Sequence, residues 1–196
     1  MKSDFRIRRL GEITEIQSGG TPQISTKSFW GGDIPWYSSG ELNGLYTSDP
    51  ERHITLAGLE GSNAKLFPKG SLLIGMYDTA ALKMSILDRP AAFNQAIAGV
   101  MPNDQINLTF VLHAINSVRD HVLDQRRGVR QKNLSLGKIR EIELRIPPIQ
   151  EQNRIVAILD EAFEVIASVK ANAQQKILSL GDLKQSLLHR AFNGDL

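Results

Sequence analysis

The most constraining feature of this sequence is a long stretch without proline that follows the double proline Pro147-Pro148. From Gln150 to about Phe192 the chain has no proline and one glycine, Gly181. Apolar residues recur there in alternating steps of four and three, the spacing of a heptad seam, with a change of register near Ile177. We therefore predict one long helix whose interface residues are Ile155, Leu159, Ala162, Ile166, Val169, Ala173, Leu180, Leu183 and Leu187.

The length of this helix limits what it can pack against. At ~1.5 Å per residue it would measure roughly 60 Å, which is more than one small domain covers. The apolar stripe then needs another helix, which predicts a coiled coil that dimerises or docks a partner. A helix lying across its own domain is the alternative. Gly181 costs about 1 kcal/mol in a helix interior and is the expected position of a bend.

The sequence before the double proline has a mixed, short-ranged pattern. We therefore expect an α+β fold with a globular domain at residues 1–147 and a coiled-coil helix at residues 148–196. Trp30 and Trp36 are expected to anchor the core or a turn, and Asn94 and Gln95 to form a buried structural pair. The expected elements are a short helix at 10–16, turns at 30–44, strands at 71–77, 83–87, 93–100 and 141–146, and an amphipathic helix at 110–122.

The composition is that of a globular protein in a reducing compartment. The hydrophobic fraction is 41% and the charged fraction 22%, and the chain has no cysteine, so disulfides and zinc–thiolate sites are excluded. The opening MKSDFRIRRL is charged where a secretory signal needs an apolar core, and no run of about 18 apolar residues occurs. These features predict a cytoplasmic protein without a membrane partner.

No catalytic constellation stands out in the sequence. The four histidines, His53, His113, His121 and His189, lack metal-ligand spacing with carboxylates. Phosphate-loop, nucleophile-elbow and dinucleotide-binding motifs are absent from the sequence. We therefore predict no catalytic residues, no bound metal and no cofactor.

Basic residues concentrate in one segment that also carries amide side chains. The sequence RRGVRQKNLSLGKIR, from Arg126 to Arg140, has no acidic residue, although the net charge of the whole chain is only +2. Short basic runs are often solvated faces, but Arg, Gln and Asn can read base edges, whereas Lys mostly anchors phosphates. The predicted DNA-binding residues are Arg126, Arg127, Arg130, Gln131, Lys132 and Asn133, with Lys83 and Arg89 as weaker phosphate candidates.

Several stretches, in the same order, resemble the specificity subunits of type I restriction–modification systems. They are LGEITEIQSGGTPQ with FWGGDIPWYSSGEL, then LFPKGSLLIGMYDTAALKMSIL with FNQAIAGVMP, then GVRQKNLSLGKIREIELRIPPIQEQNRIVAILD, and finally LKQSLLHRAFNGDL. Pro147, Pro148, Glu151 and Gln152 occupy the places usual in that family. The chain departs from it where Tyr-Gly-x-Thr-x-Gly-Lys is common, because Asp78 and Leu82 replace the two glycines.

The resemblance implies a function and a set of partners. Family members usually carry two target-recognition domains and two conserved helices, whereas this chain has one of each, so a homodimer is expected to bind a bipartite double-stranded DNA target. The implied protein partners are a modification subunit, which carries the adenine methyltransferase, and a restriction subunit. S-adenosylmethionine, ATP and magnesium would belong to those partners.

Other functions remain open on the sequence alone. A DNA-binding module or regulator that acts without methyltransferase partners would use the same basic segment and long helix. A small nuclease or a coiled-coil adaptor would also fit parts of the chain. Cleavage by the purified chain would favour the nuclease, and failure to purify with a modification subunit would favour the regulator.

Overall fold

The computed structural model describes residues 5–77, 80–124 and 133–194. The chain forms two compact units, Met1–Asn153 and Arg154–Leu196. The first is built from short strands and helices, and the second from a single long helix, which confirms the predicted α+β class. The functions assigned to the two parts stay predictions.

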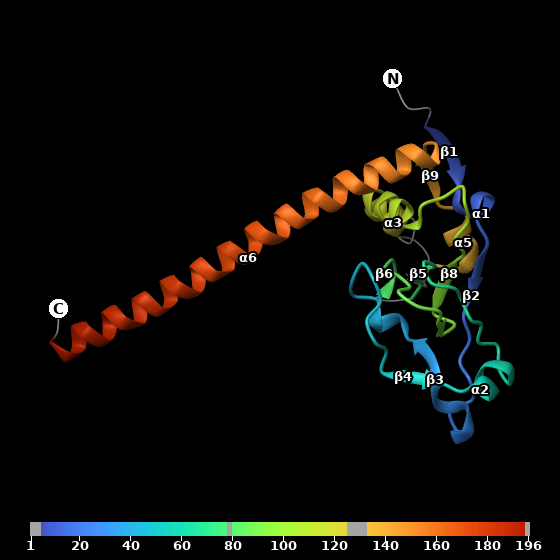
Figure 1. Ribbon diagram of the computed structural model, residues 1–196, viewed down its shortest axis with the longest axis horizontal. Coiled ribbons are helices and arrows are strands. Elements are labelled where there is room, and N and C mark those ends of the chain that lie inside the picture. Colours follow the sequence, from blue (N-terminus) through green and yellow to red (C-terminus); the bar gives the residue numbers. More distant parts are fainter. Residues whose placement is uncertain (1–4, 78–79, 125–132, 195–196) are drawn as a thin grey trace. The chain divides into compact units, whose positions relative to one another are not determined.

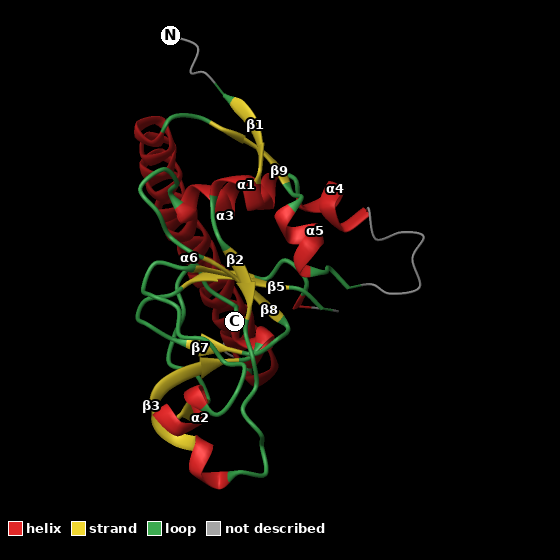
Figure 2. Cartoon of the chain, turned by 90° about the vertical axis from the view of Figure 1, so that its right-hand side faces the viewer, coloured by secondary structure: helices red, strands yellow, loops and turns green. Residues whose placement is uncertain are grey.

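Three sheets follow one another along the first unit (Figures 1 and 2). Their strands pair antiparallel except for β3 with β7. The first sheet pairs β1 (Arg6–Arg9) with β9 (Glu143–Ile146). The second has the order β2 (Ile16–Ser18), β8 (Ile97–Val100), β5 (Leu72–Gly75) and β6 (Met84–Ile86), and the third the order β4 (Arg52–Ile54), β3 (Trp30–Tyr37) and β7 (Ala92–Phe93).

Short helices connect these strands, and one long helix ends the described chain. The 3₁₀ turns are η1 (Lys27–Phe29) and η2 (Ser39–Glu41). The α-helices are α1 (Leu10–Ile13), α2 (Leu56–Glu60), α3 (Leu108–Ser117), α4 (Arg119–Asp124), α5 (Leu136–Arg140) and α6 (Ile149–Asn193). The predicted long helix is therefore confirmed, and it continues through Gly181.

The core of the first unit lies around β5 and β8. All residues of both strands are buried, because this sheet is covered on both faces. The rings of Phe67 and Phe93 pack with centroids 4.7 Å apart, beside the buried Tyr37 and Leu73. A second cluster contains Trp36 and Ile54.

The segment predicted to be turns contains the longest strand of the unit. β3 covers residues 30–37, and its pairing with β4 is interrupted between Trp30 and Ile34. Gly31 has a positive φ of 79°, and a Cβ on Gly32 would come within 2.6 Å of the Ile54 carbonyl oxygen. The two glycines therefore form an irregularity inside a strand rather than a turn between strands.

Three other predicted elements are divided differently in the structure. The helix expected at 10–16 ends at Ile13, because Ile16 pairs with Val100 in the β2–β8 ladder. The strand expected at 93–100 is two strands in two sheets, β7 and β8, joined by a corner at Asn94. The helix expected at 110–122 breaks at Val118 into α3 and α4.

The structural roles predicted for two tryptophans and two amide side chains are confirmed only in part. Trp36 is buried and donates to the Gly20 carbonyl oxygen at 3.0 Å, and Trp30 packs edge-on against it, so their anchoring role is confirmed. Asn94 is half-buried and accepts from the Ala96 amide. The prediction for Gln95 is wrong, because this side chain is exposed and hydrogen-bonds to Thr21.

The first turn of α6 belongs to the first unit, where Gln152 is fully buried. Its Oε1 accepts from the Asn107 amide at 2.8 Å, and its Nε2 donates to the carbonyl oxygens of Pro147 at 2.9 Å and Gln105 at 3.2 Å. Both amide hydrogens and the oxygen of the side chain are thus paired, as a buried polar group requires. Gln152 therefore fixes the start of α6.

Candidate nucleic-acid interface

The described parts of the connection between β5 and β6, residues 76–77 and 80–83, lie beside the end of β5. The Leu82 amide donates to the Gly75 carbonyl oxygen at 2.8 Å, and the Gly75 amide donates to that of Lys83 at 2.8 Å. A Cβ on Gly75 would lie 2.2 Å from the Ala80 carbonyl oxygen, so this close approach requires glycine. Leu82 adopts a positive φ of 57° at the position where the resembled pattern has glycine.

Arg119 holds this β5–β6 connection from the neighbouring helix. Its Nη1 donates to the Leu82 carbonyl oxygen at 2.6 Å, and its Nη2 to that of Ala81 at 3.3 Å. Both residues that supply these carbonyl groups are buried. Sequence reasoning missed Arg119, because its partners are backbone atoms that only the folded connection presents.

Lys83 lies at the edge of the same sheet, beside the segment at residues 43–47. Its Nζ donates to Asn43 Oδ1 at 2.9 Å, Ser85 Oγ donates to the Gly44 carbonyl oxygen at 2.6 Å, and the Ile86 amide donates to that of Leu45 at 2.8 Å. The segment thus covers the outer edge of β6. Lys83 remains half-buried there, with its ammonium group on an exposed amide, and its phosphate contact stays a prediction.

Arg89 forms ion pairs with two carboxylates. It lies 2.6 Å from Asp49 and 2.8 Å from Asp88, whose other oxygen accepts from Thr47 Oγ1 at 2.9 Å. Hydrogen bonds from Arg89 lower the pKa of Asp88, and the same bonds raise the pKa of Arg89. These contacts support a structural role, holding residues 47–49 against residues 88–89. The predicted phosphate contact of Arg89 also stays a prediction.

Most of the predicted DNA-binding residues lie outside the described residues. These are Arg126, Arg127, Arg130, Gln131 and Lys132. Asn133 is described and half-buried, and the next residue, Leu134, is buried and donates its amide to the Met76 carbonyl oxygen at 2.8 Å. The segment that follows the predicted readers is therefore anchored on the β5–β6 connection that also holds Lys83.

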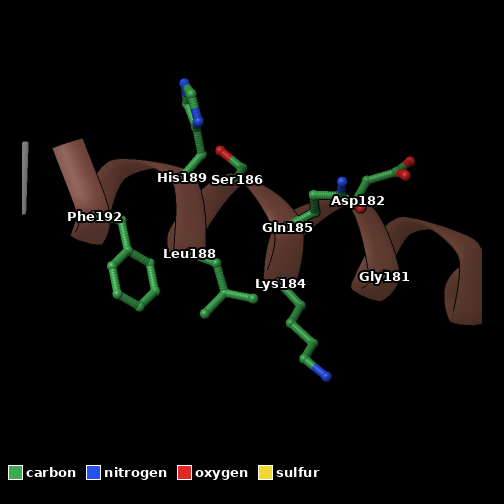
Figure 3. Close-up of a pocket in the computed structure, with 8 residues that line it drawn as sticks. All are labelled: Gly181, Asp182, Lys184, Gln185, Ser186, Leu188, His189 and Phe192. Atoms are coloured by element: carbon green, nitrogen blue, oxygen red, sulfur yellow. The ribbon is translucent and has the colours of Figure 1, made fainter.

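The second unit presents its apolar side chains to solvent. Ile155 and Leu159 are half-buried, but the predicted seam from Ala162 onward is exposed. The exposed fraction is 62% for Val169 and 65% for Leu180. Near its end, Leu188 and Phe192 project from one side of the helix, whereas Asp182, Ser186 and His189 project from the other (Figure 3).

The described ranges hold neither a cluster of metal-ligating side chains nor a helix suited to a membrane. No three potential metal-ligating side chains come together among residues 5–77, 80–124 and 133–194. No helix in that part of the chain combines the length and apolar character needed to cross a membrane.

A comparison with known protein families identifies the family of this chain. The model of the type I restriction modification DNA specificity domain matches residues 2–179. The chain belongs to this family. The resemblance seen in the sequence is thereby confirmed.

Two curated members of this family are specificity subunits of type I restriction enzymes. The MjaIX specificity subunit of Methanocaldococcus jannaschii is 26% identical over 172 residues, which cover 85% of this chain and 40% of the relative. The EcoR124I/EcoR124II specificity subunit of Escherichia coli is 29% identical over 182 residues, covering 87% and 44%. The chain thus spans less than half the length of these relatives.

Solved structures show the same fold. The HsdS subunit from Thermoanaerobacter tengcongensis superposes with a TM-score of 0.73 at 22% identity, over 100% of this chain and 46% of that one. A chain from a study of complex assembly and conformational transition of the type I R-M system gives a TM-score of 0.84 at 22% identity, over 100% and 47%.

Proposed function

We propose that this chain is the sequence-specific DNA-recognition component of a type I restriction–modification complex. The supporting observation is the match of the DNA specificity domain to residues 2–179, which include the first unit and most of α6. Residues 1–147 form the target-recognition domain in this proposal. Residues 148–196 form the helix that pairs two copies and docks a modification subunit.

The exposed seam of α6 supports the pairing of two copies. Exposed leucine, isoleucine and valine side chains recur along the helix over more than five turns, from Ile166 to Leu187. Removing such a stripe from water is the main driving force for helix association. Two antiparallel copies would present two identical recognition domains to inverted half-sites separated by an unread spacer.

The chain itself performs no catalysis in this proposal and holds no cofactor. Adenine methylation belongs to the modification subunit, and translocation and cleavage belong to the restriction subunit. S-adenosylmethionine, ATP and magnesium accordingly bind to those partners. The specificity chain selects the DNA on which they act.

The mass of the chain in solution tests the assembly. Light scattering is measured on the chain alone and after mixing it with the modification subunit of its own system. We expect a dimer that takes up two modification subunits. A monomer that ignores the modification subunit would contradict the proposal and favour a DNA-binding module or regulator without methyltransferase partners.

Base reading is tested by substitutions in the predicted basic segment. We expect Arg130→Ala and Gln131→Ala to change which sequence is selected from a random duplex library, because both side chains can pair with base edges. We expect Lys132→Ala to weaken binding to all duplexes alike and to reduce the salt dependence. Equal losses on every sequence for all three variants would refute this division of roles.

A further inference from the structure

Residues 38–47 run from η2 to the outer edge of β6, and Glu41 fixes their start. Its Oε2 accepts from the amide and from Oγ of Ser38, both at 2.7 Å, and its Oε1 accepts from the Glu51 amide at 2.9 Å. The next residue, Leu42, is 2% exposed and packs in the core of the first unit. The backbone that leads to Asn43 is therefore fixed on its N-terminal side.

The residues after Asn43 are held by the sheet. The Gly44 carbonyl oxygen accepts from Ser85 Oγ at 2.6 Å, and the Leu45 carbonyl oxygen accepts from the Ile86 amide at 2.8 Å. Asn43 is thus an exposed residue between two anchored stretches. A side chain on such a backbone loses less conformational entropy when it binds a partner.

The side-chain amide of Asn43 is held at both of its ends. Its Nδ2 donates to the Gly40 carbonyl oxygen, and its Oδ1 accepts from Lys83 Nζ, both at 2.9 Å. The opposite orientation of the amide would bring its NH₂ group to the ammonium and its oxygen to the carbonyl, so only one orientation satisfies both partners. These bonds use one of the two hydrogens and one of the two lone pairs, which leaves one donor and one acceptor for a partner outside the chain.

The remaining donor and acceptor of Asn43 match the major-groove edge of adenine. That edge presents N7 as an acceptor and the N6 amino group as a donor, and an asparagine amide pairs with both at once. Guanine presents two acceptors there, N7 and O6, so the Asn43 oxygen would face another oxygen. The arrangement therefore discriminates between the two purines.

The charge beside Asn43 favours an anionic partner. The ammonium group of Lys83 carries three hydrogens, and Asn43 takes one of them. Two carboxylates at the far end of the segment, Asp49 and Asp88, are bonded by Arg89. The positive charge of Lys83 is therefore available to attract the phosphate backbone of DNA.

Access to Asn43 is open on the side of Gly40. Gly40 is exposed, and its φ lies outside the left-handed region. A Cβ at this position would have Ser38 Oγ as its nearest neighbour, 4.0 Å away. Neither the backbone conformation nor the packing requires glycine there, and the missing side chain leaves room for a base edge beside the Asn43 amide.

We propose that Asn43 reads adenine in the major groove of the target DNA, and that Lys83 is the positioning residue that orients its amide. This inference rests on the proposed function. It adds a base-reading residue outside the predicted DNA-binding set, and it gives Lys83 a role in discrimination besides the predicted phosphate contact.

The variant Asn43→Ala is compared with the matched control Asn103→Ala. Asn103 is also exposed and held at both ends, by the Ile13 carbonyl oxygen and the Gln105 amide at 2.9 Å each, but both partners are backbone groups. In selection from a random duplex library, we expect Asn43→Ala to lose the preference for adenine at one position of the half-site and to keep the others. Affinity for the preferred duplex should fall roughly 5- to 150-fold, and Asn103→Ala should select the unaltered sequence.

A modified base identifies the contact. Replacing the adenine at that position by 7-deazaadenine removes the N7 acceptor. We expect this change to weaken binding of the unaltered chain about fivefold or more and to leave binding of Asn43→Ala unchanged, because the variant has already lost the donor. An equal loss in both proteins would assign N7 to another residue and overturn the proposal.

The variant Lys83→Met tests the positioning role. The readout is the ratio of affinities for two duplexes that carry adenine or guanine at the position read by Asn43. We expect this ratio to fall about threefold or more, because the amide loses the partner that fixes its orientation. Weaker binding to both duplexes with an unchanged ratio would show a phosphate contact alone and would overturn the positioning role.

The variant Gly40→Leu leaves Asn43 in place and fills the open side beside it. We expect it to melt like the unaltered chain, because a Cβ has space there, and to bind the preferred duplex about tenfold more weakly. Unchanged affinity would contradict the approach of DNA on this side. If the unaltered chain selects no sequence, the proposed function fails and this inference with it. If the unaltered chain selects a sequence that Asn43→Ala also selects, only this inference fails.

Discussion

The two units treat the same kinds of side chain in opposite ways. In the first unit, Leu72 and Ile97 are fully buried, whereas in the second unit Val169 and Leu180 are more than half exposed. The apolar residues of the first unit find their partners within the chain. Those of the second stay exposed. We therefore expect the first unit to fold on its own and the second to depend on the proposed association.

The largest expected effect comes from placing charge on the exposed seam. We expect Ile166→Asp with Leu180→Asp to raise the dissociation constant of the dimer at least about a hundredfold, because pairing would bury unpaired carboxylates. Analytical ultracentrifugation measures the change. Ser168→Asp with Gln175→Asp adds the same charge on the other face of α6 and should leave the dimer intact; equal losses for both pairs would locate the interface elsewhere.

A substitution in the core of the first unit should lower the stability of that unit. Ile97→Ala is expected to lower its free energy of unfolding by about 2–5 kcal/mol, because it removes buried volume from β8. The control Ile24→Ala, at a side chain that is 70% exposed, should change it by less than about 0.5 kcal/mol. Denaturant unfolding distinguishes them, and similar costs would contradict the assigned core.

The first turn of α6 contains the buried Gln152, and its substitution should have an effect of intermediate size on stability. We expect Gln152→Ala to cost about 1–3 kcal/mol, since the Asn107 amide and the Pro147 carbonyl lose their partner. Gln150→Ala, at an exposed position two residues earlier, is the matched control. Thermal melts of both variants measure the difference, and an equal effect would exclude the anchoring role of Gln152.

The smallest expected effect concerns the ion pair between the half-buried Asp88 and the exposed Arg89. The pKa of Asp88 is lowered in the folded chain by its hydrogen bonds from Arg89, so its contribution to stability is present above the ordinary value of 3.8 and lost as the pH falls through the lowered value. Asp88→Asn should flatten the acid limb of the stability curve slightly, because exposed pairs contribute little. Asp33→Asn is the control, and a steeper acid limb in Asp88→Asn would reverse the assignment.

The long helix was predictable because its signal is local and repeats. Spacing alone identified the seam from Ile155 to Leu187, and Pro148 lies just before the first residue of α6. The strand β3 was missed because Gly31 and Gly32 are typical of turns. Their role as an irregularity depends on pairing with Ile54, which lies far along the chain.

The candidate interface was less predictable for a similar reason. Arg89 was predicted to contact phosphate, yet it is held by Asp49 and Asp88 once the chain folds. Arg119 gave no signal, because it bonds carbonyl groups that any sequence possesses. The amide of Gln152 was noticed only through the family resemblance, since its partners lie at residues 105–107 and 147.

The pairing of β1 with β9 has a consequence for biosynthesis. Arg6 lies opposite Ile146, so the sheet that joins the two ends of the first unit cannot form until almost all of that unit has been synthesised. Closing so long a loop is slow compared with local pairing. The exposed apolar stripe of α6 follows directly in the order of translation. Under the proposed pairing of two copies, a nascent chain therefore has little time to finish folding its first unit before that pairing can begin.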